Sequence, residues 1–177
     1  MLYLKILIVI ILAVALDSQV PTWWSAFRYV DMALLVTVYF ALMRDPIVGM
    51  LVGYVAGLAG DLAPGAGPVI GVGGFSKTAL GYLIAMVAVR FQLEGAMLRV
   101  AVIAVSSVVN SAMFVGLHGL MGQSLTQETP PEQVVLRVLL EAAANLIAGV
   151  GLFWLLDRVF PENAPGAAMR VRRRFYD

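Results

Sequence analysis

Residues 46–91 read PIVGMLVGYVAGLAGDLAPGAGPVIGVGGFSKTALGYLIAMVAVRF, and this stretch decides the fold. Two apolar segments flank the turn-rich linker DLAPGAGP at 61–68. The first segment carries overlapping GxxxG patterns that continue to the linker, with glycines at Gly49, Gly53, Gly57 and Gly60. Because glycine lets helix backbones approach closely, we predict that another helix packs on this face. That helix could belong to this chain or to a partner.

The composition places the chain in a membrane. Of its 177 residues, 61% are hydrophobic and only 13% are charged, and the mean hydropathy is +0.90. Soluble domains are usually about half apolar and a quarter charged. We therefore predict an all-α, polytopic integral membrane protein. The absence of cysteine excludes disulfides, thiol catalysis and cysteine-ligated metals.

The apolar runs predict a single six-transmembrane-helix bundle over residues 1–160, followed by a basic tail at 161–177. The predicted spans are 2–16, 27–43, 46–62, 69–91, 97–122 and 134–160. The turn before the third span ends at Pro46, which suits the first position of a helix. Arg28 and Asp31 lie near the start of the second span.

The basic residues predict the orientation of this bundle. With six spans, the loops at 17–25, 61–68 and 123–133 share one side and contain no lysine or arginine. The opposite side carries the N-terminus, Arg44, Arg90, Arg99, Arg158 and the tail. Since cytoplasmic loops are enriched in these residues, we expect both termini in the cytoplasm. The start of the chain also resembles a signal peptide, with Ala13-Val14-Ala15 as a cleavage site; we expect residues 1–16 to be retained as a helix.

Lys77 is a cation inside an apolar run. A charge at that depth costs about 3 kcal/mol on insertion scales. Glu141 falls at a similar distance from the outer end of the sixth span, so a Lys77–Glu141 pair would lower the cost for both. Such a pair could be a structural contact, or part of a proton relay or a partner site; we favour the structural interpretation.

Polar residues form a seam on the last two spans. Arg137, Glu141 and Asn145 recur every four residues and share one helix face. Asn110 falls at about the depth of Asn145, so we predict a hydrogen bond between these side chains. Ser106, Ser107 and Ser111 extend the seam, which we interpret as interhelical contacts.

No cofactor or metal site is expected. His118 is the only histidine and has no second ligand at a suitable spacing. The glycines near 65–74 do not follow a strand, so we read them as turn and packing residues. A membrane enzyme that uses Asp61, His118 and Glu141 is a weaker alternative.

The tail carries four arginines, at Arg170, Arg172, Arg173 and Arg174. Such a cluster binds anionic lipid or docks a cytoplasmic partner. We do not expect it to bind nucleic acid, because the patch is short and belongs to an integral membrane protein.

One family shares this arrangement. The glycine-rich third span ends in Gly-Leu-Ala-Gly-Asp61-Leu, Gly71 follows the linker, and Gly81-Tyr82 lies deeper in the fourth span. This resembles the rod shape-determining protein MreD family, with its pattern of GLLxDL, LG, and GY or GF. The Arg-Asp-Pro turn and the basic tail are also similar, whereas Lys77 departs from the apolar residue of many members.

The resemblance implies a non-enzymatic scaffold of the bacterial elongation machinery. Such a scaffold binds MreC and helps couple MreB filaments to the peptidoglycan synthase RodA and its partner transpeptidase. The family fold is similar to the substrate-binding subunits of energy-coupling-factor transporters. This gives the alternative function, a vitamin or small-molecule transporter subunit whose outward pocket is lined by Lys77, Glu141 and Asn145.

Overall fold

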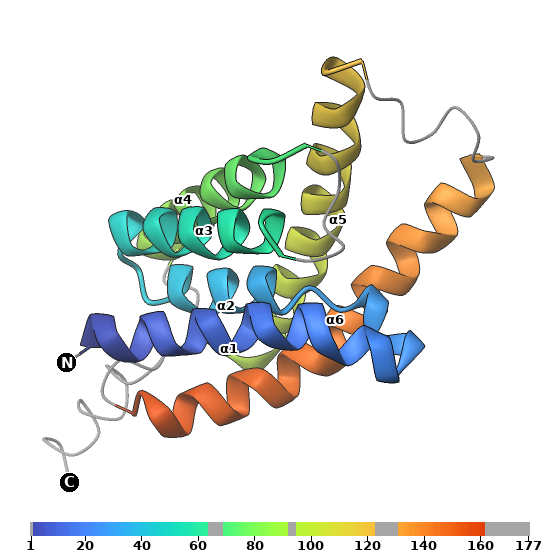
Figure 1. The fold of residues 1–177 in the computed structure, drawn as a ribbon. Coiled ribbons are helices and arrows are strands. Elements are labelled where there is room, and N and C mark those ends of the chain that lie inside the picture. The colour runs from blue at the N-terminus through green and yellow to red at the C-terminus, as the bar shows by residue number, and fades with distance from the viewer. Residues whose placement is uncertain (1, 64–68, 92–94, 123–130, 162–177) are drawn as a thin grey trace, which may run out of the picture.

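The computed structural model describes residues 2–63, 69–91, 95–122 and 131–161 (Figure 1). Within these ranges the chain is helical and contains no strand, which confirms the all-α class. The elements follow in the order α1 (Leu2–Trp23), the 3-10 helix η1 (Ser25–Tyr29), α2 (Met32–Ala41), α3 (Pro46–Asp61), α4 (Val72–Phe91), α5 (Ala96–Leu120) and α6 (Pro131–Val159).

The count of six spans is not confirmed. Among the described helices, α1, α4, α5 and α6 are long and apolar enough to cross a membrane. Helix α2 has 10 residues and α3 has 16. At 1.5 Å per residue they extend about 15 and 24 Å, which is less than the roughly 30 Å of a bilayer core.

Helix α2 differs most from the prediction. The predicted span 27–43 begins five residues too early, because η1 and a short extended segment precede the helix. The side chains from Ala33 to Ala41 are all buried, and α2 contacts each of the other five α-helices. In Figure 1 it lies between α1 on one side and α3 with α4 on the other. A helix surrounded by protein does not need the length that lipid exposure demands.

Helix α1 is longer than predicted. It continues through 17–23, a segment that the charge pattern predicts to be part of an outer loop. Polar side chains there bond within the protein. The Ser18 hydroxyl donates to the Val14 carbonyl at 2.9 Å. The Asp17 carboxylate accepts two backbone hydrogen bonds from the start of α2.

The glycine face of α3 packs against α4 of the same chain. A Cβ on Gly49 would lie 2.6 Å from the carbonyl oxygen of Gly81. A Cβ on Gly53 or Gly57 would overlap the carbonyl of Lys77 or Gly73 even more closely. Carbon and carbonyl oxygen do not approach so closely, so these three positions require glycine. Gly60 is different, because a Cβ there would meet no atom within 4 Å; within this chain it does not take part in the close α3–α4 contact, and packing against a partner stays a prediction.

Helices α3 and α4 form a helical hairpin, and Asp61 links the end of α3 to the start of α4. Its Oδ2 accepts hydrogen bonds from the Gly71 and Gly74 amides at 2.8 and 3.1 Å, and its Oδ1 accepts one from Gly73 at 3.2 Å. It therefore satisfies amides at the start of α4, which have no partner within that helix. Gly71 has φ +104°, a conformation that favours glycine.

Aromatic rings pack together at the end of the bundle opposite Asp61. Tyr39 of α2 packs edge-on against Phe40 and Phe153, with ring centroids 5.3 and 5.2 Å away. Its hydroxyl donates to Asp157 Oδ1 at 3.1 Å, and Arg99 holds Oδ2 at 2.8 Å. The polar groups at this end of α2 are therefore paired with α5 and α6.

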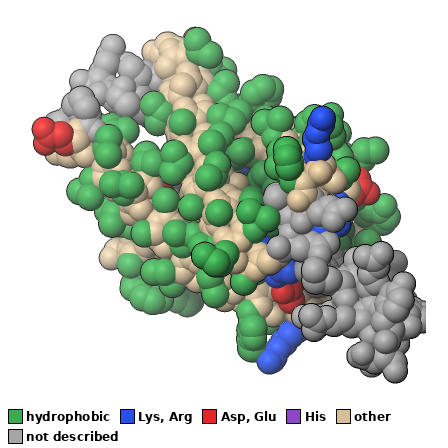
Figure 2. Space-filling model, turned by 180° about the vertical axis from the view of Figure 1, so that it is seen from behind, with side chains coloured by type: hydrophobic (Ala, Val, Ile, Leu, Met, Phe, Trp, Pro, Cys, Tyr) green, Lys and Arg blue, Asp and Glu red, His purple; other side chains and the backbone are tan. Residues whose placement is uncertain are grey.

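The start of α1 and the end of α6 lie at this same end of the bundle (Figure 1). Lys5 Nζ is 6.0 Å from the centroid of the Phe160 ring. Figure 2 shows hydrophobic side chains spread over the face of the molecule, as expected for apolar helices in a membrane. The arginine-rich tail lies outside the described residues.

Candidate functional site

A polar cavity of about 380 Å³ lies among α1, η1 and α3–α6, beside the start of α2. Its walls include the predicted residues Lys77, Asn110, Glu141 and Asn145, which come from three helices. Gly60 and Asp61 line it from the end of α3. The cavity thus collects most of the intramembrane polar residues that the sequence singled out.

The floor of the cavity is built around the N-terminus of α2. Asp31 caps this helix and accepts a hydrogen bond from the Leu34 amide at 2.7 Å. Asp17 of α1 accepts from the Met32 and Ala33 amides at 2.8 and 3.0 Å. An unsatisfied amide in a membrane costs several kcal/mol, so these two carboxylates allow α2 to begin inside the bundle.

Lys77 forms an ion pair with Asp31 and not with Glu141. The Lys77 Nζ to Asp31 Oδ2 distance is 2.9 Å, and the side chains are 11% and 28% exposed. Glu141 is held by Arg137 Nε at 2.9 Å and by the Ser111 hydroxyl at 2.7 Å. The predicted Lys77–Glu141 pair is therefore wrong, because the segment before α2 places its own carboxylate next to α4.

The predicted hydrogen bond between the two asparagines is also replaced by bonds to other groups. Asn145 accepts from the Asp31 amide at 2.8 Å and donates to the Ser107 hydroxyl at 3.0 Å. Asn110 accepts from the Ser76 hydroxyl at 3.1 Å and donates to Asp31 Oδ2 at 3.4 Å. Both asparagines therefore reach Asp31, which links α2, α4, α5 and α6.

Two arginines line the exposed part of the cavity. Arg28 of η1 is exposed, and its Nε donates to the Ser25 carbonyl at 3.1 Å. The side chain of Arg137 on α6 is 73% exposed. Lys77, Asn110 and Asn145 are buried. The two arginines therefore lie at the exposed side of the cavity, and the hydrogen-bonded polar residues lie at its buried side.

Sequence reasoning missed Asp17 and Asp31 as members of this site. Asp31 did have a local signal, since an aspartate directly before an apolar run is typical of a helix N-cap. Asp17 had none, because its partners are backbone amides 15 and 16 residues away. Contacts of that kind depend on how the chain turns back through η1.

The candidates for enzyme chemistry are not all brought together. Asp61 and Glu141 line the cavity, whereas His118 does not. His118 is buried, and its Nδ1 lies 2.9 Å from the Phe114 carbonyl of the same helix. Across the described ranges, no group of three or more histidine, aspartate or glutamate side chains is arranged to hold a metal ion.

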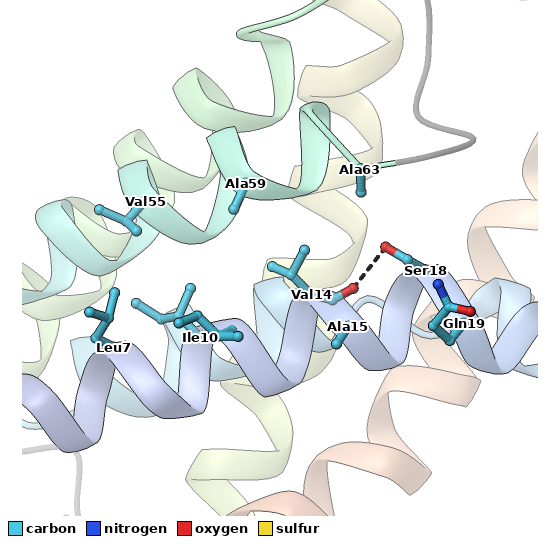
Figure 3. Close-up of a pocket in the computed structure, with 10 residues that line it drawn as sticks. Leu7, Ile10, Val14, Ala15, Ser18, Gln19, Val55, Ala59 and Ala63 are labelled. Carbon is cyan, nitrogen blue, oxygen red and sulfur yellow. Dashed lines mark hydrogen bonds between the residues drawn. The ribbon is translucent and has the colours of Figure 1, made fainter.

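A second hollow, of about 370 Å³, lies between α1 and α3 (Figure 3). Apolar side chains such as Ile10, Val14 and Val55 line most of it. Ser18 and Gln19 are its only polar residues, and the Ser18 hydroxyl is already bonded to Val14 (Figure 3). It offers no charged group, so the polar cavity is the stronger candidate site.

Comparisons with known proteins identify no relative. No family model, no curated protein and no solved structure matches the chain.

Proposed function

We propose that this chain is a non-enzymatic membrane scaffold of the MreD type in the bacterial inner membrane. It would bind MreC and help couple MreB filaments to RodA and its partner transpeptidase, with both termini in the cytoplasm. The observation that supports this proposal is the α3–α4 hairpin. Three residues that carry the family resemblance, Asp61, Gly71 and Gly81, make contacts between its two helices.

Asp61 accepts a hydrogen bond from Gly71, and Gly81 packs directly on the backbone of Gly49. These residues therefore form one packed unit, as expected if the motif preserves a common hairpin. Tyr82, the fourth matching position, is 42% exposed on α4. It is available to a neighbouring helix or to lipid.

The scaffold proposal is tested by isolation from native membranes. The tagged full-length chain is extracted in a mild detergent and its bound proteins are identified. We expect an MreC homologue, and depletion of the chain should turn rod-shaped cells round. Gly53→Leu, which cannot keep the hairpin, should lose the partner, whereas Gly151→Leu should keep it, because a Cβ at Gly151 meets open space. Recovery of no cell-wall component would contradict the proposal.

A second function is favoured by the cavity. A substrate-binding subunit of a vitamin or small-molecule transporter requires a pocket lined by Lys77, Glu141 and Asn145, and these three residues do line one cavity. Its volume falls in the range of about 300–1,000 Å³ that is common for ligand sites. A vitamin library should then contain a compound that raises the unfolding temperature of the purified chain. A complete library without any such compound would count against this function.

A further inference from the structure

Every acid of the polar cavity already accepts hydrogen bonds from the protein. Asp17, Asp31, Asp61 and Glu141 place eight carboxylate oxygens around it, and each oxygen accepts at least one hydrogen bond from the protein. Within the described ranges, the hydrogen bonds to Asp17 and Asp61 all come from backbone amides at helix starts. Each carboxylate oxygen can accept a second hydrogen bond, but all four acids are already used to hold helix starts, Lys77, Arg137 or Ser111 in place.

Two arginines of the cavity have unused donors. Arg28 and Arg137 each use Nε in one hydrogen bond. Since a guanidinium has five N–H donors, four remain on each side chain, and no residue in the described ranges accepts them. Both arginines line the same cavity. The free N–H groups of these two side chains suit acceptor groups of a ligand.

The position of these arginines indicates the direction of binding. Arg137 is largely exposed, whereas Asn145 at the floor is 2% exposed. Phe114, near the end of α5, and Arg137, near the start of α6, line the cavity. Figure 1 shows α5 and α6 diverging toward these ends. A ligand can therefore reach the arginines from solvent or from between the helices.

We propose that this cavity binds a small anion, whose phosphate or carboxylate group is held by Arg28 and Arg137. The planar guanidinium fork matches both groups, and charge-assisted bonds of this kind are the strong ones. The rest of the ligand extends toward the buried part of the cavity. This inference rests on the second proposed function, since it assigns the chemical class of ligand to the same cavity.

The anionic group could come from a soluble molecule or from a lipid headgroup. The purified full chain is therefore tested in two arms at constant ionic strength. The first arm measures its unfolding temperature in neutral detergent with inorganic phosphate or citrate against chloride. The second arm compares phosphatidylcholine nanodiscs with nanodiscs that also contain phosphatidylglycerol. Stabilisation in the first arm identifies a soluble anion, and stabilisation only in the second identifies a lipid phosphate.

Matched variants assign the effect to the cavity. Arg28→Gln and Arg137→Gln should each weaken the apparent affinity about 10-fold to 100-fold, as expected for loss of a charged hydrogen-bond donor. Arg158→Gln is the control, since Arg158 stacks on the Trp154 ring and does not line the cavity. Glu141→Gln releases Arg137 from its ion pair and should strengthen anion binding, which tests the site even if Arg137→Gln folds poorly.

The outcomes separate this inference from the function on which it rests. No stabilisation in either arm overturns the inference, as does equal stabilisation of wild type and both cavity variants. A neutral or cationic vitamin that stabilises the chain without dependence on Arg28 or Arg137 would keep the transporter function and overturn only the anion assignment.

Discussion

Alanine at Gly53 would force α3 and α4 apart. The three atoms nearest to the new Cβ are all backbone, and they include the Lys77 carbonyl and the Thr78 amide nitrogen at 3.0 Å. Backbone cannot rotate away as a side chain can, so the helices must separate. Overpacking of this kind costs about 1–3 kcal/mol, and the severe overlap places Gly53→Ala near the upper end.

Alanine also favours helix over glycine by about 1 kcal/mol, which leaves a net loss of about 2 kcal/mol. For a chain of this size each kcal/mol changes the unfolding temperature by about 2–4 °C, so we expect a decrease of roughly 4–8 °C. The three tryptophans allow this transition to be followed by fluorescence in detergent.

Gly60→Ala is the matched control on the same helix. A Cβ there meets no atom within 4 Å, so the change should leave stability the same or raise it by up to about 1 kcal/mol. An unfolding temperature of Gly53→Ala within 1 °C of wild type would refute the close α3–α4 contact. Equal losses in both variants would show that the effect is not one of packing.

Three further predictions concern the ion pair and the helix caps. Lys77→Met should destabilise the protein by about 3–5 kcal/mol, because it leaves Asp31 without its cation, and Asp31→Asn in the same chain should restore part of the loss in a double-mutant cycle. Glu141→Gln should leave the Lys77 pair intact and cost less than about 1 kcal/mol by thermal unfolding, since only an exposed pair and one hydroxyl bond are changed; a loss as large as that of Lys77→Met would contradict the geometry. Asp61→Ala should cost about 1–2 kcal/mol and increase amide hydrogen exchange at Gly71–Gly74, whereas Asp61→Asn, which keeps one acceptor, should lose less.

The α3–α4 hairpin could be predicted because its signals are local. Pro46 opens α3 as expected, and the side chain of Asp45 before it caps the helix. The glycine spacing identified the packed face, and the ends of α3 and α4 fall within about three residues of the predicted spans. The sequence alone did not identify the partner helix, because the same pattern serves contacts within a chain and between chains.

The cavity was predictable only in part, because its geometry depends on α2. Depth along each span placed Lys77 level with Glu141 and Asn110 level with Asn145, and all four residues do line one cavity. The predicted Lys77–Glu141 pair is wrong because the prediction treated α2 as a full span, which placed Asp31 near one membrane surface. Because η1 precedes α2 and places Asp31 inside the bundle, Asp31 is the carboxylate that pairs with Lys77.

The buried position of α2 has a consequence for how the protein is made. The amide of Asp31 donates to Asn145, which is 114 residues further along the chain. At about 5–20 residues per second, a ribosome needs roughly 6–23 s to synthesise that interval. Helix α2 therefore leaves the ribosome well before one of its partners exists, and its exposed amide must stay hydrated or be held by the insertion machinery until α6 arrives. A nascent chain that ends before α6 should remain susceptible to membrane proteases.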